Sequence, residues 1–233
     1  MVKTTEHHPL YGDIQITINP RARRMTLRAR DGFICITMPP YTPRKVLDDA
    51  LAKHGSKLLA ECATHRQAII DGNYKYISDN FCFSLAADAT KKFYLSVDGK
   101  SATLYYPAET DLTSPTMQEW IRRVRVTALR RVATTNLPLR LKELAAKHGF
   151  TYSSVTLRDS HSRWGSCSNR GSISLSIYLQ LLPSYLSDYV LLHELCHTVE
   201  MNHGERFWAL LDKVTGRSAK ELREVLRGFK TDF

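Results

Sequence analysis

The sequence has no long hydrophobic segment. None of its apolar runs approaches the roughly 18–20 residues that a helix needs to cross a membrane. Residues 1–12 also lack the apolar core of a secretory signal peptide. We therefore expect a cytoplasmic protein with no membrane partner.

Cysteine is scarce and shows no recurring spacing. No two of the five residues form a Cys-x-x-Cys pair: Cys35, Cys62, Cys82, Cys167 and Cys196. An odd number at scattered positions argues against a disulfide framework, and structural zinc sites usually use several cysteines. We expect reduced thiols and no purely structural zinc site.

Acidic residues are outnumbered by basic ones, 23 to 33, which leaves a net charge of +10. The excess is concentrated in two arginine-rich segments, residues 21–30 and 122–131. Such charge favours a polyanionic substrate or an association with nucleic acid, although two solvated faces of an ordinary protein would give the same composition. A glycine-rich phosphate loop with its lysine is absent, which weighs against nucleotide chemistry.

The best-defined motif runs from His193 to His197. Its spacing, His-Glu-x-x-His, places both imidazoles on one face of a helix, because four residues advance about 400° and about 6 Å. Two neutral imidazoles one turn apart can bind one Zn²⁺. Glu194 lies about 100° round the helix, in position to take a proton from a zinc-bound water. Such a motif also arises by chance on solvated helices, but apolar neighbours here indicate a buried one, where these polar groups are costly without a metal.

A third ligand must come from outside this helix. His203 can reach the metal only if the helix ends before it, since on a continued helix it would lie about 15 Å away along the axis. Asn202 and Gly204 flank it, and both residue types favour left-handed helix caps. The spacing matches that of metzincins, except that Glu200 replaces a glycine, so we expect the turn at residues 201–202. If His203 is not a ligand, a glutamate from the C-terminal region is the alternative: Glu205, Glu221 or Glu224.

Hydrophobic periodicity along the chain predicts an α+β protein. Short alternating segments bounded by Asp, Gly and Asn indicate strands, and Thr42-Pro43, Ser114-Pro115 and Ser218 open helices. The expected strands lie within 12–39 and at 74–77, 81–85, 93–97, 102–106, 152–158 and 172–177. The expected helices are 43–70, 115–136, 138–148, the metal helix after Pro183, and two more after His203. We expect a β-rich N-terminal region with one long helix (residues 1–112) before the catalytic domain (residues 113–233).

The segment 161–168 is too polar and glycine-broken to predict a regular element. It places Arg163 and Trp164 next to a glycine, with His161 just before them. In one interpretation Arg163 pairs with Glu205 or Glu200 and braces the metal site. In the other, Arg163 or His161 faces the cleft and stabilises the charge that develops in the transition state. We therefore treat Arg163, with Glu194, as a candidate catalytic residue.

Several segments together resemble the YgjP-like metallopeptidase family, which is related to the SprT-like and minigluzincin zinc peptidases. They are residues 162–167 (SRWGSC), 173–175, 189–197, 202–203 and 206–208. The resemblance covers nearly the whole chain. It implies a zincin-like α+β catalytic domain with a metal-binding active-site helix. It also implies that His193, His197 and His203 bind Zn²⁺ and that Glu194 is the catalytic acid/base. The chain departs from many members at Ser176, where they carry Asn, and at Lys57-Leu58, where they carry Trp-Ile.

The leading hypothesis is a cytosolic zinc-dependent metallopeptidase that uses a Glu-activated zinc-bound water. The alternating strand 172–177, just upstream of the metal helix, supports it if that strand is a sheet edge that pairs with a peptide or protein substrate. Because some family members are described as acting on UTP, a nucleoside-triphosphate pyrophosphatase is the first alternative. The others are a SprT-like protease that acts near nucleic acid and a non-enzymatic nucleic-acid-binding module, whose binding would weaken steeply with salt.

Overall fold

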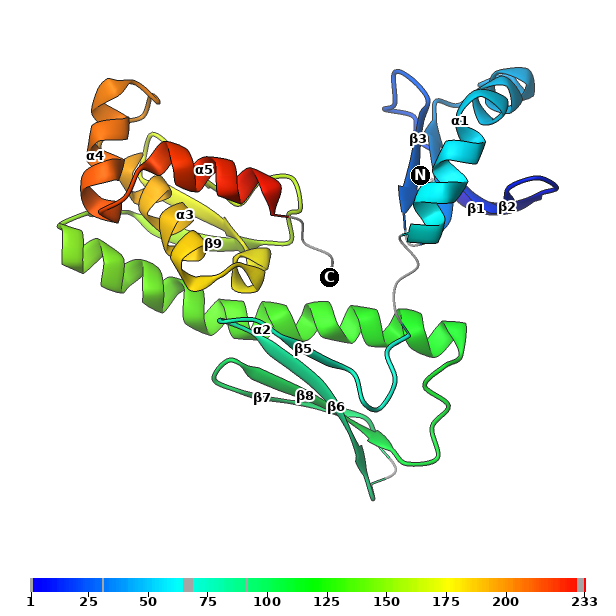
Figure 1. The fold of residues 1–233 in the computed structure, drawn as a ribbon, viewed down its shortest axis with the longest axis horizontal. Coiled ribbons are helices and arrows are strands. Elements are labelled where there is room, and N and C mark those ends of the chain that lie inside the picture. Colours follow the sequence, from blue (N-terminus) through cyan, green and yellow to red (C-terminus); the bar gives the residue numbers. More distant parts are fainter. Residues whose placement is uncertain (1, 31, 65–68, 91, 230–232) are drawn as a thin grey trace. The chain divides into compact units, whose positions relative to one another are not determined.

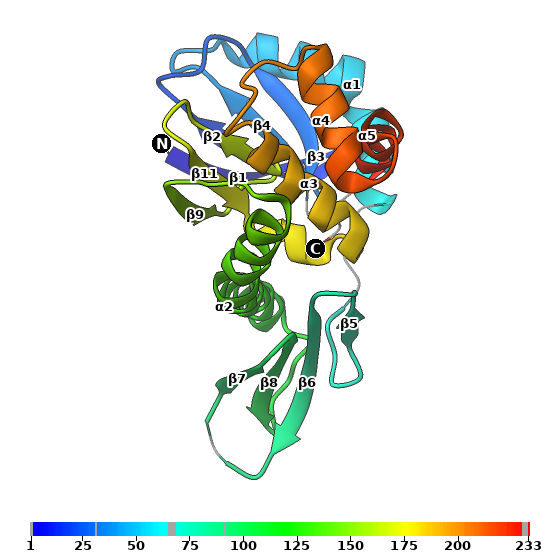
Figure 2. The same ribbon diagram turned by 90° about the vertical axis from the view of Figure 1, so that its left-hand side faces the viewer.

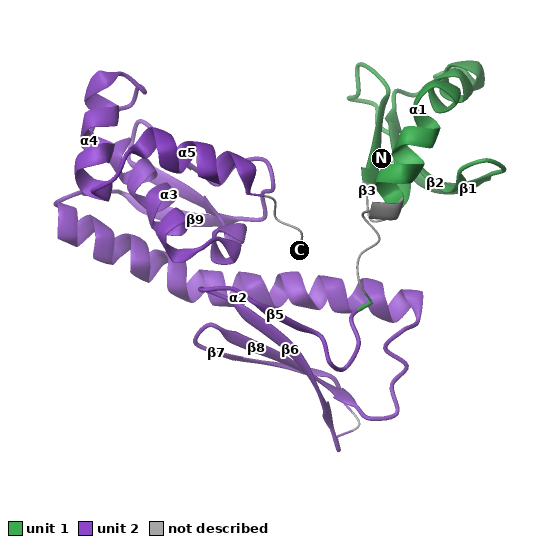
Figure 3. Ribbon diagram, in the orientation of Figure 1, with its two compact units in different colours: residues 1–69 green, residues 70–233 purple. Residues whose placement is uncertain are grey.

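The computed structural model describes residues 2–30, 32–64, 69–90, 92–229 and 233. The chain divides into two compact units, residues 1–69 and 70–233 (Figure 3). The division therefore falls well before the boundary at 112/113 that the sequence suggested. The second β-rich region packs on the long helix that follows it, so it belongs with the metal helix and not with the N-terminal strands.

The first unit is one four-stranded sheet and one helix. Its strands are β1 (Val2–His8), β2 (Gly12–Ile18), β3 (Thr26–Arg30) and β4 (Phe33–Met38), in the order β1-β2-β4-β3, with β2 and β4 parallel. Isoleucines at alternate positions of β2 and β4 are buried against Leu47 and Leu51 of α1 (Arg44–Thr64). The predicted helix extends beyond α1 into residues 65–68, which lie outside the described residues.

Gly55 lies inside α1, where it faces Tyr11. A Cβ atom at this position would lie 2.5 Å from Cζ of Tyr11. The glycine therefore lets the Tyr11 ring pack directly on the helix, and α1 continues unbroken through it.

The second unit begins with another four-stranded sheet. Its strands are β5 (Lys75–Ile77), β6 (Cys82–Asp88), β7 (Tyr94–Asp98) and β8 (Ser101–Pro107), in the order β5-β6-β8-β7. One face of this sheet packs on α2 (Pro115–His148), which runs between the sheet and the remaining elements of the unit (Figures 1 and 2).

The helix α2 is continuous, whereas the sequence predicted two helices separated before Pro138. The proline lies inside the helix, yet Val132, Leu137 and Leu141 keep one helical register and are each at most 2% exposed. Burial of this continuous apolar face outweighs the hydrogen bond that proline removes, which costs about 3 kcal/mol.

The elements around the metal helix follow α2. They comprise β9 (Ser154–Arg158), β10 (Gly165–Cys167), β11 (Ser172–Ser176), the 3-10 helix η1 (Ile177–Leu181), α3 (Ser184–Cys196), α4 (Glu205–Thr215) and α5 (Ala219–Gly228). The sheet order is β10-β11-β9, with β11 antiparallel to β10 and parallel to β9. Two expectations were wrong. Part of the segment 161–168 forms a strand, and 172–176 is the central strand of its sheet and not an edge.

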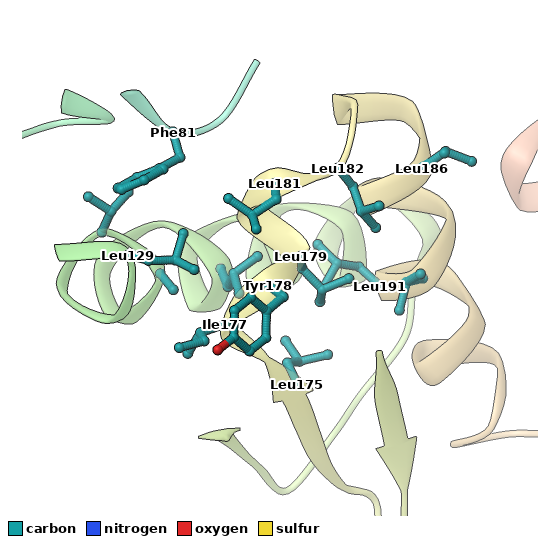
Figure 4. Close-up of a cluster of buried hydrophobic side chains, with 14 of the residues drawn as sticks. Phe81, Leu129, Leu175, Ile177, Tyr178, Leu179, Leu181, Leu182, Leu186 and Leu191 are labelled. Carbon is teal, nitrogen blue, oxygen red and sulfur yellow. The ribbon is translucent and has the colours of Figure 1, made fainter. Parts of the chain in front are cut away.

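The hydrophobic core of this unit joins its layers. In Figure 4, Phe81 reaches the cluster from the turn just before β6, Leu129 from α2, Leu175 from β11 and Leu191 from α3. The residues of η1 are buried between α2 and α3, which explains why a segment of five residues without regular periodicity is so apolar. The α+β fold with a β-rich N-terminal region is as the sequence predicted. Among the described residues, no helix has the length and hydropathy needed to cross a membrane.

Candidate metal centre

Three histidines converge at the end of α3. The Nε2 atom of His193 lies 3.2 Å from Nε2 of His197 and 3.1 Å from Nε2 of His203. One nitrogen from each ring can be chosen so that all three lie within 4.8 Å of one another. His197 is buried, His193 is half-buried and His203 is exposed, so the cluster opens to solvent on the side of His203.

The chain reaches this arrangement because α3 ends at Cys196. The amide groups of Val199 and Glu200 both donate to the carbonyl oxygen of Cys196, at 3.0 and 2.9 Å, and turn the chain out of the helix. The left-handed cap expected around Asn202 is absent, since the one described non-glycine residue with positive φ is Tyr41. Successive tight turns directly after the helix, and not a left-handed cap, reverse the chain so that His203 reaches the other two histidines.

Two contacts orient the ligating groups. Nδ1 of His197 lies 3.1 Å from the carbonyl oxygen of Glu200, so its proton is held there and the lone pair of Nε2 is left free. The indole Nε1–H of Trp208 donates to the carbonyl oxygen of His203 at 3.0 Å. Among the described residues, the buried Nδ1 of His193 has no partner.

Phe207 forms an apolar floor under all three imidazoles. Its ring centroid lies 4.5 Å from that of His197, 4.7 Å from His203 and 4.9 Å from His193, and the residue is fully buried. From the sequence alone, this residue and Trp208 are predicted only to pack in the core. Their positions four and five residues after His203 place them in the first turn of α4, and nothing in the local pattern distinguished that role.

The electrostatics keep the three rings neutral. Burial, followed by the neighbouring His197 and His203, lowers the pKa of His193 to about 3. Burial also lowers the pKa of His197 and of His203. Neutral imidazoles can offer the lone pairs of their nitrogens to a metal ion without first losing a proton. In a tetrahedral zinc site with Zn–N bonds of about 2.0–2.1 Å, ligand nitrogens lie about 3.3 Å apart, so the His193 separations fit Zn²⁺.

The Glu194 side chain packs on β10. A Cβ atom at Gly165 would lie 2.5 Å from Oε1 and 2.7 Å from Cγ of Glu194, so a glycine is required where the strand passes this side chain. Glu194 is 5% exposed, and its Oε2 atom has no hydrogen-bond partner among the described residues. Burial raises the pKa of its carboxyl group to about 7. A carboxylate with this pKa is well suited to accept and return a proton near neutral pH.

The segment before β10 does not brace the metal site through Arg163. The Arg163 side chain is exposed and has no hydrogen bond or ion pair within the part of the chain that the structure describes, so the suggested pairing with Glu205 or Glu200 is absent. Instead, His161 packs on Tyr178, with ring centroids 4.0 Å apart, and the Tyr178 hydroxyl donates to Asp159 at 2.9 Å. Trp164 is half-buried against the core. None of the alternative glutamate ligands belongs to the histidine cluster.

The site, with candidate metal-binding residues at the end of α3 and in the segment after it, is typical of a metal-dependent hydrolase. The chain belongs to the YgjP-like family, because the model of the YgjP-like, metallopeptidase domain matches residues 23–229. The crystal structure of the metallopeptidase zymogen of Pyrococcus abyssi abylysin is similar over 37% of this chain and 88% of that chain, with 26% sequence identity and a TM-score of 0.34. No curated protein matches the chain.

Proposed function

We propose that this protein is a cytoplasmic zinc-dependent metallopeptidase in which Glu194 is the general acid/base. The observation that carries the proposal is the convergence of the His193, His197 and His203 nitrogens at the end of α3, the helix that also carries the buried carboxylate of Glu194. Three protein ligands leave one position open, which is typical of catalytic and not of structural zinc sites.

Each residue of the site has a separate role in this proposal. His193, His197 and His203 would hold the metal, and bound zinc would supply Lewis acidity to the attacking water and to the scissile carbonyl group. Glu194 takes the proton of that water and later delivers it to the leaving amine. Its burial against Gly165 excludes bulk water from the carboxylate, and its pKa of about 7 allows both transfers at neutral pH.

The strand β10 is the element best placed to bind an extended peptide. It is an edge strand, paired only with β11, and Gly165 within it touches Glu194. A peptide that pairs with its free edge would extend past the catalytic carboxylate, with backbone hydrogen bonds supplying the affinity. The sequence suggested the strand 172–177 for this role, but that strand is paired on both sides and has no free edge.

A nucleoside-triphosphate pyrophosphatase of the UTP type is the second candidate. The unpaired guanidinium of Arg163, directly before β10, favours it, because a free cation near the site could bind a phosphate group. A SprT-like protease that works near nucleic acid is a variant of the first candidate. The basic charge of the first unit favours this variant, because its 69 residues carry 11 Lys/Arg and 6 Asp/Glu and could bind a polyanion.

One experiment separates the peptidase from the pyrophosphatase. The zinc-loaded protein is incubated with a casein-like substrate and, separately, with each nucleoside triphosphate, and the Glu194→Gln variant is the control. We expect proteolysis that the variant lacks and no release of pyrophosphate. Hydrolysis of UTP without proteolysis would refute the peptidase proposal, and activity that survives in the variant would refute the role of Glu194.

A further inference from the structure

A pocket of about 600 Å³ adjoins the metal centre on the side of the two C-terminal helices. It is lined by Trp208 of α4 and by Lys220, Glu221, Arg223, Glu224 and Val225 of α5. Trp208 links the pocket to the histidine cluster, since its ring centroid lies 5.8 Å from that of His203 and its Nε1–H donates to the His203 carbonyl oxygen. A volume of this size accommodates one or two amino-acid residues of a ligand.

The position of α5 follows from its sequence. Ser218 caps the helix by accepting a hydrogen bond from the Glu221 amide group, and the Ala219 amide group donates to Asp212 of α4 at 2.7 Å. Ala219 and Leu222 face the core, with 0% and 7% exposure. The helix is thus anchored through its inner face, and the charged outer face is left to line the pocket.

Arg223 lines this pocket beside Trp208. Its guanidinium carbon is 5.6 Å from the centroid of the Trp208 ring. No carboxylate among the described residues pairs with Arg223 or with Lys220. The guanidinium group is planar, and two of its N–H groups can donate to one carboxylate.

The carboxylates of the pocket do not neutralise these cations. Glu224 is bound by Arg227, one turn along α5, at 2.6 Å. Glu221 is the remaining acidic group, against Lys220 and Arg223. The pocket therefore has an excess of positive charge. Its most directional hydrogen-bond donor is the guanidinium group of Arg223, beside Trp208.

We propose that Arg223 is a specificity-determining residue that binds a carboxylate of the peptide substrate close to the scissile bond. This inference rests on the peptidase function proposed above. The carboxylate comes either from an acidic side chain or from the free C-terminus of a short peptide, since both present the same planar group to the guanidinium.

The test uses matched peptides and three variants of the zinc-loaded protein. One peptide pair differs only in a C-terminal carboxylate or amide, and other pairs differ only in Glu or Gln at one position near the cleaved bond. Arg223→Met removes the proposed contact and Arg223→Lys restores the charge without the planar fork. Arg217→Met is the control, because Arg217 packs in the same way on Tyr185, at 5.6 Å, outside the pocket.

We expect the wild type to prefer the acidic member of at least one pair, and Arg223→Met to raise KM for that peptide by about 10- to 100-fold. Its kcat, zinc content and melting temperature should change little, Arg223→Lys should recover part of the loss, and Arg217→Met should resemble the wild type. The pair that responds identifies the source of the carboxylate.

Three results would overturn the inference. Equal turnover of all acidic and neutral peptides, or an Arg223→Met variant that weakens both members of a pair alike, refutes the carboxylate subsite while the peptidase remains. Failure of the zinc-loaded wild type to cleave any peptide refutes the proposed function, and the subsite with it. Binding of the same peptides to the Glu194→Gln variant, measured calorimetrically, gives the preference for the carboxylate independently of turnover.

Discussion

Replacing Glu194 with glutamine should stabilise the metal-free protein at alkaline pH. The side chain is 5% exposed, and burial raises the pKa of its carboxyl group from 4.5 to about 7. Because the folded-state pKa lies above the unfolded value, the contribution of Glu194 to the free energy of unfolding is fully present below about pH 4.5. It is lost as the pH rises through 7. One pKa unit corresponds to about 1.4 kcal/mol, so the loss approaches about 3 kcal/mol at pH 8. Glutamine has nearly the same shape, fits beside Gly165 and carries no charge to desolvate.

The assay is urea unfolding of both proteins after removal of metal, at pH 5 and at pH 8. We expect the glutamine variant to gain about 2–3 kcal/mol relative to the wild type between the two conditions. The lowered histidine pKa values affect both proteins equally and cancel in this difference. Zinc should shrink the effect, because a nearby divalent cation favours the ionised carboxylate. A difference that is the same at both pH values would show that Glu194 is not desolvated as the structure indicates.

Four further outcomes follow from the same site. The purified protein should contain about one equivalent of zinc, and His193→Ala should lose most of it, as metal analysis will show; full retention would refute the ligand set. The glutamine variant at position 194 should keep its zinc but turn over about 10²–10⁴-fold more slowly, and an unchanged rate would exclude this residue as the base. Gly165→Ala should displace Glu194, which should lower the free energy of unfolding by about 1–3 kcal/mol and turnover by at least about tenfold, with zinc retained. Normal stability and activity would contradict the close contact between Gly165 and Glu194. Arg163→Met should leave zinc content and melting temperature unchanged, because the side chain has no partner, and should lower turnover by about 10²-fold if it acts in the cleft. A variant that loses zinc would contradict the absence of a partner for this side chain.

The sequence by itself determined what depends on local periodicity. The helical repeat alone places His193 and His197 on one face, and the alternation of apolar residues identified most strands. Turn and cap residues set several boundaries, among them Ser218, which opens and caps α5 as the sequence predicted. These features need no knowledge of the rest of the chain, because each depends on residues only a few positions apart.

Tertiary structure decided what depends on contacts between distant segments. The central position of β11, the free edge of β10 and the contact of Gly165 with Glu194 all arise from strand pairing and from packing on α3, which leave no local periodic signal. The continuity of α2 through Pro138 likewise reflects a buried face shared by several elements. Phe207 reaches the histidines because α4 packs against α3, so its role under the three rings is set by the fold and not by its neighbours in the chain.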